Sequence, residues 1–278
     1  MRVLILSILS LLWVSPVFAA PIWIERQFVP VNELIDDKFL QHSDEATVEI
    51  DYAVWATFLE TYLEVDDAGI ARVAYSSVAT EDKAGLIAFI SGLVSMDPAS
   101  LTKEQQFAYW INLYNAATIA LVLDHYPQES IRDIEVSGDG PWDTVVAEVA
   151  GVALTLNNIE HGIIRPVFKD ARIHYAVNCA SVGCPNLASV PYTAETVDDM
   201  LTDAAREYVG HPRGVSVRRG RVTASKIYGW YREDFGADEA EVLDHIRQYA
   251  TPELIEKLQG VETIRSYKYD WDLNEVRR

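Results

Sequence analysis

The residues best suited to chemistry lie close together in the middle of the chain. Glu160, His161, His174, Cys179 and Cys184 fall within 25 consecutive positions. They combine a nucleophile, a base and a carboxylate that can orient the base. We therefore expect a thiol-dependent hydrolase or acyl transferase, in which a cysteine thiolate attacks an ester or amide and a histidine moves the proton.

Cys184 is the preferred nucleophile, with Cys179 as its rival. Pro185 suits the first position of a helix, which would place Cys184 at the N-cap, where free amides and the helix dipole stabilise a thiolate. The preferred base is His174. On an expected strand over 171–178, His174 and Cys179 would face opposite sides, whereas Cys184 lies in the loop that follows.

His161 is the less favoured base. It lies in the first turn of a helix expected from about Asn158 to Phe168, where the helix dipole disfavours an imidazolium and a solvated face is the ordinary outcome. The spacing of Glu160 from Asn157 fits a capping box. Glu160 is thus either a helix cap or the group that orients an imidazole.

The same two cysteines support a non-catalytic interpretation. They are the only cysteines in the chain, and in an oxidising compartment two such neighbours are first expected to form a disulfide. A bridge over so few residues would shape a tight loop, and the protein would then be a binding or adaptor module. The third interpretation is a metal-binding protein, although no His-Glu-x-x-His or Cys-x-x-Cys spacing is present, so we assign no metal ligands.

Composition and the first residues restrict the partners. Residues 1–19 combine a basic Arg2, an apolar run and a Val17-Phe18-Ala19 cleavage pattern, which predicts a signal peptide and an exported protein, periplasmic or secreted. No second apolar segment predicts a membrane span. The formal net charge of −19 disfavours nucleic acid as a partner. No nucleotide-binding motif is present, so we expect no cofactor, and the partner is a small molecule, a peptide or a cell-envelope substrate.

A long helix must position these residues. Thr102 is expected to cap a helix over 103–125 that is apolar around most of its circumference, which is typical of a central helix. Asn112 and Asn115 lie within it, and amides in so apolar a setting require hydrogen-bond partners. They either tie loops to the helix or contact the substrate.

Periodicity and turn residues predict the remaining elements. Further helices are expected over 46–65, 80–96, 193–209, 239–249 and 252–258, and extended segments over 71–78, 152–156, 215–225 (a hairpin) and 263–274. The fold class is α+β: a helix-rich single domain with a small, mostly antiparallel sheet. It would comprise an N-terminal extension with a helix (20–80) and a main domain (81–278).

Several motifs together resemble the domain-of-unknown-function family 547 (DUF547). They are Phe107–Ala116, Ile159–Arg165, Asp170–Cys179, Cys184-Pro185 and Tyr269-Asp270-Trp271. The resemblance covers roughly 81–274 and implies a fold family without a secure activity. Some plant relatives keep the first cysteine and carry Ser at the second, which is why Cys179 stays a rival. The candidate substrate-binding residues in these motifs are Asn112, Asn115, Arg172, Asn178, Asp270 and Trp271.

Overall fold

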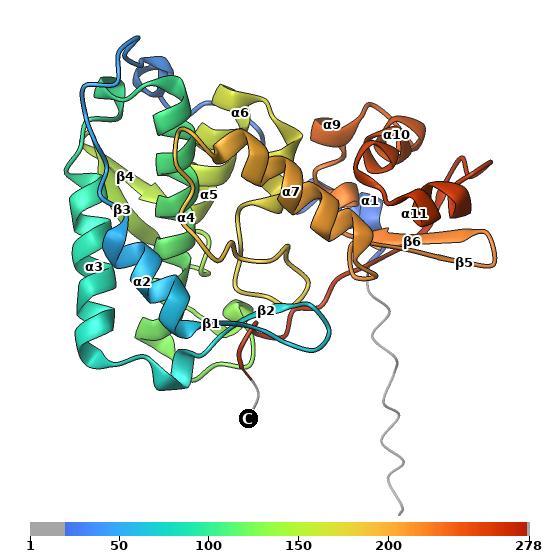
Figure 1. Ribbon diagram of the computed structural model, residues 1–278, viewed down its shortest axis with the longest axis horizontal. Coiled ribbons are helices and arrows are strands. Elements are labelled where there is room, and N and C mark those ends of the chain that lie inside the picture. Colours follow the sequence, from blue (N-terminus) through green and yellow to red (C-terminus); the bar gives the residue numbers. More distant parts are fainter. Residues whose placement is uncertain (1–19, 277–278) are drawn as a thin grey trace, which may run out of the picture.

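The computed structural model describes residues 20–276 of the 278-residue chain (Figure 1). The predicted signal peptide, residues 1–19, lies outside the described residues. Helices predominate, and the described strands form two antiparallel pairs and one three-stranded sheet. The α+β class is confirmed.

The element bounds are as follows. The helices are α1 (Ile22–Glu25), α2 (Ala53–Tyr62), α3 (Thr80–Val94), α4 (Lys103–His125), α5 (Leu156–Ile159), α6 (Arg165–Phe168), α7 (Val197–Gly210), α8 (Ile227–Trp230), α9 (Arg232–Phe235), α10 (Glu239–Tyr249) and α11 (Pro252–Lys257). The strands are β1 (Leu63–Val65), β2 (Ala71–Val73), β3 (Val145–Val149), β4 (Val152–Thr155), β5 (Val215–Arg218), β6 (Arg221–Ser225) and β7 (Ile264–Lys268). A π-helical turn, η6 (Glu160–Ile164), joins α5 to α6, and a 3-10 helix, η7 (Ala171–Tyr175), follows α6.

Helix α4 runs through the main hydrophobic core, as predicted. Its start is the expected one: the Thr102 side chain accepts from Gln105 N, and the Gln105 side chain accepts from Thr102 N. Helices α3, α5 and α7 pack around it. Because α4 is surrounded, polar side chains on it can bond only to other parts of the protein or face a pocket.

The segment before α3 is less helical than its periodicity predicts. Helix α2 begins only at Ala53, whose amide is capped by the Asp51 carboxylate, and β1 follows it directly. The expected strand over 71–78 is shortened to β2. Trp55, Phe58 and Leu59 of α2 are nevertheless buried in the same core as α4, so this segment packs on the central helix.

The C-terminal elements largely match the prediction. Strands β5 and β6 form the expected hairpin, and β7 adds to β6 in parallel, because the chain returns through α10 and α11 before reaching it. A second cluster of buried apolar side chains fills the space between this sheet, α7 and α10. Helix α7 begins at Val197 rather than near Thr193.

Two local predictions around the candidate residues were wrong. The capping box before η6 is formed by Thr155 and Asn158, not by Asn157 and Glu160. The segment over 171–178 is not a strand, because Asp170 caps the 3-10 helix η7 instead. The opposite-face argument that separated His174 from Cys179 therefore does not apply.

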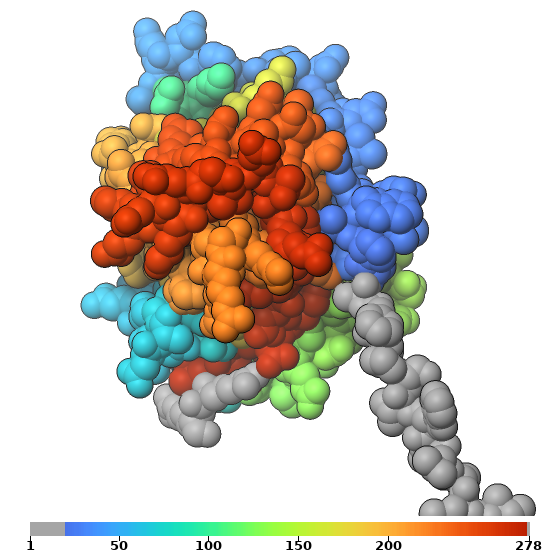
Figure 2. All heavy atoms as spheres, turned by 90° about the vertical axis from the view of Figure 1, so that its right-hand side faces the viewer, coloured from blue at the N-terminus to red at the C-terminus, as the bar shows by residue number. Residues whose placement is uncertain are grey.

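Residues 20–36, which we call the N-terminal strap, lie against the C-terminal half of the chain. Figure 2 shows the strap in blue beside the orange and red segments. Glu25 pairs with Lys226, Arg26 pairs with Glu233, and Ile35 N donates to Gly162 O. The strap thus covers the junction between η6, α8 and α9.

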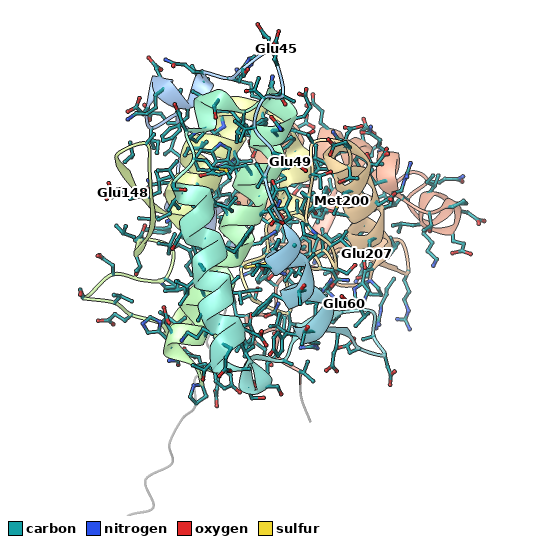
Figure 3. All side chains as sticks on the ribbon, turned by 60° about the vertical axis from the view of Figure 1, so that its left-hand side comes forward. Glu45, Glu49, Glu60, Glu148, Met200 and Glu207 are labelled. Carbon is teal, nitrogen blue, oxygen red and sulfur yellow. A yellow bond between two sulfur atoms is a disulfide. The ribbon has the colours of Figure 1, made fainter. Side chains whose placement is uncertain are left out.

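The acidic composition is carried on the outside of the molecule. Figure 3 shows the labelled Glu45, Glu49, Glu60, Glu148 and Glu207 projecting away from the ribbon, and all five are exposed. Among residues 20–276, no helix combines the length and apolarity needed to cross a membrane.

Candidate functional site

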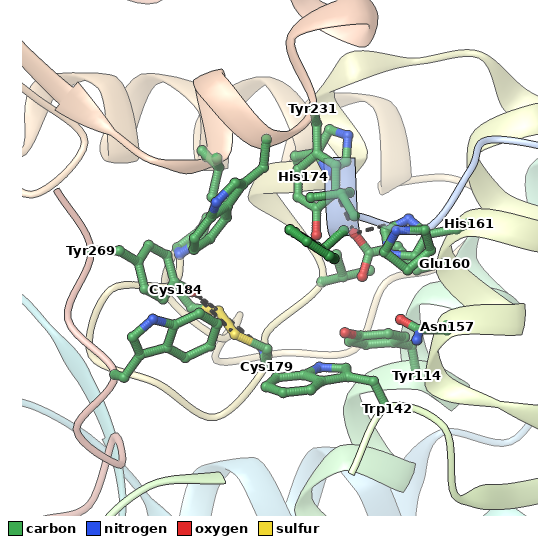
Figure 4. A pocket seen from close by; sticks show the side chains of 18 of the residues that line it. Tyr114, Trp142, Asn157, Glu160, His161, His174, Cys179, Cys184, Tyr231 and Tyr269 are labelled. Carbon is green, nitrogen blue, oxygen red and sulfur yellow. Dashed lines mark hydrogen bonds and ion pairs between the residues drawn. A yellow bond between two sulfur atoms is a disulfide. The ribbon is translucent and has the colours of Figure 1, made fainter. Parts of the chain in front are cut away.

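A pocket of about 300 Å³ opens between α4 and η6 on one side and α8 and the segment after β7 on the other. Its walls come from α4, η6, η7, the cysteine loop (residues 179–186), α8 and the segment after β7, and the N-terminal strap forms one edge (Figure 4). Glu160, His161, His174, Cys179 and Cys184 all line it. The structure thus brings the five candidate catalytic residues to one cavity.

Glu160 is the buried carboxylate of this pocket. Its Oε1 lies 3.5 Å from His174 Nδ1 and 3.9 Å from His161 Nδ1. Burial by itself raises the pKa of Glu160, but His161, His174 and Arg165 together outweigh burial and lower the pKa to about 2. Glu160 is therefore ionised at neutral pH, and a carboxylate of so low a pKa is a poor general base.

His174 lies between two carboxylates. Its Nε2 is 2.7 Å from Asp234 Oδ2, and its Nδ1 faces Glu160. Burial lowers the pKa of His174, but the hydrogen bonds to Asp234 and Glu160 more than compensate and raise it. Tyr231 stacks on the imidazole with ring centroids 4.3 Å apart. Both ring nitrogens therefore face carboxylates rather than a cysteine sulfur.

Arg165 anchors this network from behind. Its side chain is fully buried, its Nε lies 2.6 Å from Asp234 Oδ2, and its Nη2 lies 3.2 Å from Glu233 Oε1. Its Nη1 is 3.2 Å from His161 Nδ1. Because α6 continues η6, one helical segment presents Glu160 to the pocket and Arg165 to α9. Such π-helical turns frequently occur at functional sites.

The expectation of a solvated His161 was wrong. His161 is only 3% exposed, because the π-helical turn directs it into the network rather than outward. Burial lowers the pKa of His161 to about 4, although Glu160 acts in the opposite direction. The imidazole is thus neutral at pH 7, and its Nδ1 accepts a hydrogen bond from Arg165.

Cys179 and Cys184 form a disulfide, so neither described cysteine is a free thiol. Cys179 N and Tyr269 Oη each lie 3.0 Å from Cys184 Sγ and donate to it. No helix begins at Pro185, where the chain is irregular up to α7, so the prediction of Cys184 at an N-cap was wrong. The loop instead closes on itself, because the bridge and the Tyr269 hydroxyl hold it.

Aromatic rings form the wall next to the disulfide. Trp271 contacts Tyr269 at 4.6 Å, Trp230 at 5.6 Å and Trp142 at 5.7 Å between ring centroids. Figure 4 shows Trp142 along one side of the cavity, opposite His174 and Tyr231. At the same end as Glu160, Asn157 Nδ2 donates to Asp143 Oδ1 at 2.8 Å. The cavity is therefore mostly aromatic, with its polar groups gathered at one end.

Of the candidate substrate-binding residues, only Trp271 lines the pocket. The Asn115 side chain donates to the Ala176 carbonyl and accepts from the backbone N of Asn178. The Asn178 side chain in turn donates to Pro185 O and accepts from Ala180 N. Asn112 bonds Trp55 and the backbone of Tyr192. Arg172 pairs with Asp170 and Asp198 away from the cavity. Asp270 acts through its carbonyl, which accepts from Gly183 N. These groups position the cysteine loop and the adjoining elements.

Asp234, Arg165, Tyr231 and Trp142 were not selected from the sequence as site residues. The first three meet only because α9 folds back onto α6 and η7. A signal was present in the segment over 228–235, which combines four aromatic side chains, two acids and one arginine in eight positions. So dense a mixture is unusual for an ordinary surface turn. Among the described residues, no group of His, Cys, Asp and Glu has the arrangement of a metal site.

The fold and the cavity define an α+β protein with an aromatic pocket next to a disulfide. Residues 98–209 match the family model described as "Protein of unknown function, DUF547", so the chain carries a DUF547 domain and the suspected family is confirmed. The match includes α4, η6 and the cysteine loop but not the Tyr269–Trp271 segment. No curated protein and no solved structure matches the chain.

Proposed function

We propose that this protein is a non-catalytic binding module that takes up a small molecule in the pocket between α4, η6 and the cysteine loop. The observation that carries the proposal is the composition of the cavity walls: rings on most sides and one buried, ionised carboxylate at one end. Small-molecule sites are typically concave, largely apolar and equipped with few polar groups. The volume of about 300 Å³ lies at the lower end of their range of roughly 300–1,000 Å³.

In this proposal the cysteines have a structural role. The Cys179–Cys184 bridge shapes the loop against Tyr269, and the Asn115 amide fixes the segment before it. His174 holds Glu160 in place, and neither histidine transfers a proton. The low pKa of Glu160 supports a binding role for this carboxylate, because a weak base is better suited to accepting a hydrogen bond than to removing a proton.

We also propose that the protein acts outside the cytoplasm, after removal of residues 1–19. The apolar leader and the disulfide both support this, because structural disulfides persist in oxidising compartments. Cell fractionation and the intact mass of the purified protein test it. A mass corresponding to a chain that begins at Ala20 is expected, whereas a full-length cytoplasmic protein with two free thiols would contradict it.

A ligand screen tests the binding function. A metabolite library is screened on the oxidised protein by the shift in thermal unfolding temperature, because a ligand that binds only the folded state raises that temperature. Hits are repeated with Glu160→Gln and Trp142→Ala, in which the shift should disappear. The matched control is Trp23→Ala, which removes an exposed indole outside the pocket. Binding that survives both pocket substitutions would contradict the proposal.

A thiol-dependent hydrolase or acyl transferase is the second candidate, and one observation favours it. Cys184 Sγ accepts from both Cys179 N and Tyr269 Oη, and two such donors would stabilise a thiolate once the bridge is reduced. This candidate predicts that the wild type turns over an ester only with reductant present, that Cys184→Ser is inactive, and that Cys179→Ser is active without reductant. Wild-type turnover without reductant, or any turnover in Cys184→Ser, would exclude it.

A further inference from the structure

The walls of the pocket restrict the chemistry of its ligand, if the proposed binding function holds. The first restriction comes from the rings. Trp142 and Trp271 meet at 69° with centroids 5.7 Å apart, so the two indoles form a corner rather than a flat stack. The face of an aromatic ring carries the negative part of its quadrupole and attracts weakly positive C–H groups. Such a corner suits a compact ring with polarised C–H faces.

The second restriction comes from the polar end. Glu160 presents an acceptor, and because Asn157 Nδ2 already donates to Asp143, the Asn157 carbonyl and the Asp143 carboxylate add further acceptors. Burial and the neighbouring charge of Glu160 raise the pKa of Tyr114 well above 10, so its phenol stays neutral. This end thus presents several acceptors, and a ligand that occupies it must supply hydrogen-bond donors to them.

The third restriction concerns charge. Glu160 lies 3.5 Å from His174, and Asp234 and Glu233 pair with Arg165 and Arg26. Each of these three carboxylates therefore has a basic partner, and the other acid of the lining, Asp143, accepts from Asn157. An organic cation gains little from such a network and loses its hydration on entry, whereas neutral hydroxyl groups can donate to Glu160 without a charge penalty.

We propose that the pocket binds a neutral saccharide ring, which stacks on the Trp142–Trp271 corner and donates hydroxyl hydrogen bonds to Glu160 and Asn157. The same chemistry is offered by a free monosaccharide and by the terminal unit of a longer glycan. The cavity volume of about 300 Å³ suits one ring, so a longer glycan would insert only its end.

Titration calorimetry on the purified mature protein tests this proposal. The probes are glucose, galactose, N-acetylglucosamine and their short oligosaccharides, with choline as a cationic comparison and cyclohexanol as an apolar one. We expect at least one saccharide to bind more tightly than choline and cyclohexanol. Equal affinity for a monosaccharide and its oligomer indicates a free sugar, and tighter binding of the oligomer indicates a glycan end.

Substitutions then locate the site. Trp142→Ala and Glu160→Gln should each weaken saccharide binding at least tenfold, Trp142→Phe should keep most of it, and Trp23→Ala should leave it unchanged. Urea unfolding checks that each variant is folded. Trp142→Phe tests stacking while it keeps an aromatic ring in the wall of the pocket. Saccharide binding that is equal in all variants would overturn the proposal.

The failure of this proposal is distinguishable from failure of the binding function. If the metabolite screen finds only cationic or apolar ligands that need Trp142 and Glu160, the saccharide proposal is wrong and the binding function stands. If no compound in the screen depends on these two residues, both are wrong.

Discussion

His174 Nε2 lies 2.7 Å from Asp234 Oδ2, and this bond joins the middle of the chain to α9, 60 residues further on. The same carboxylate oxygen receives Arg165 Nε at 2.6 Å. Asp234 therefore contacts two buried basic side chains that come from different helical segments. The pocket wall that includes Glu160 depends on a residue outside the family match.

Asp234→Asn should strongly destabilise the protein. The amide removes the counter-ion of the buried Arg165, and breaking a buried ion pair costs about 3–5 kcal/mol of unfolding free energy. Urea unfolding measures this loss, and nuclear magnetic resonance titration should show a lowered pKa for His174. The matched control is Glu233→Gln, where the carboxylate side chain is 46% exposed and the expected loss is below about 1 kcal/mol. Equal losses in the two variants would contradict the assignment of Asp234 as the main counter-ion of Arg165.

Acid should destabilise the protein through His161. Its pKa is about 4 in the folded protein, against 6.5 for an ordinary histidine, so the unfolded chain binds the proton first as the pH falls. The free energy of unfolding should therefore decrease between pH 6.5 and 4, by up to about 3 kcal/mol. His174 acts oppositely, because its raised pKa gives stability that is complete below pH 6.5 and is lost as the pH rises. Glu160 contributes a loss only below pH 4.5, towards its pKa of about 2.

Urea unfolding of wild type and His161→Phe at several pH values measures the contribution of His161. Between pH 6.5 and 4.5 the variant should lose less unfolding free energy than the wild type. A variant that follows the wild-type curve over this interval would show that His161 is not the responsible group.

The disulfide should stabilise the loop by a modest amount. A bridge between residues five apart restricts the unfolded chain by only about 2 kcal/mol, because loop-closure entropy grows with loop length. Cys179→Ser and Cys184→Ser should therefore each lower the unfolding free energy by about 1–3 kcal/mol, and the double variant by no more than either one. With reductant the differences should shrink. Redox-independent, additive losses would indicate two ordinary core residues.

Asn115→Ala should cost about 2–4 kcal/mol of unfolding free energy, because it leaves the buried Asn178 amide and Ala176 carbonyl without partners. The cysteine loop follows directly, so ligand affinity should fall as well. Gln27→Ala on the exposed strap is the control and should change stability by less than about 0.5 kcal/mol. Urea unfolding of both variants checks the difference. A loss at Asn115 no greater than at Gln27 would show that the amide does not anchor the loop.

Gly183→Ala should displace the aromatic wall. A Cβ atom at Gly183 would lie 2.7 Å from the backbone N and O of Asp270, so the segment that carries Tyr269 and Trp271 must move. We expect altered tryptophan fluorescence and weaker ligand binding. The control is Gly92→Ala in α3, where the new methyl meets no atom within 4 Å and should stabilise the helix by about 0.5–1 kcal/mol. Unchanged fluorescence and ligand binding in Gly183→Ala would contradict this account of the wall.

Elements whose signals are local were predictable from the sequence. Thr102 and Gln105 satisfy each other's backbone across three residues, so the start of α4 needs no distant partner. The hairpin of β5 and β6 is likewise determined by alternation around a Gly-containing turn. The cluster of His, Glu and Cys residues was visible as a density of reactive side chains, and the motifs within it identified the family.

What each of these residues faces was decided only by tertiary structure. The segment over 171–178 has the alternation of a strand, yet none of the described strands pairs with it, and capping by Asp170 makes a 3-10 helix the better local solution. Glu160 matches a capping spacing, but Thr155 and Asn158 take that role and the π-helical turn directs the carboxylate inward. The composition of 228–235 marks the neighbourhood of Asp234, but its partners His174 and Arg165 come from η7 and α6 and cannot be read from that segment. Side-chain partners of this kind are set by packing between distant segments, which sequence periodicity does not encode.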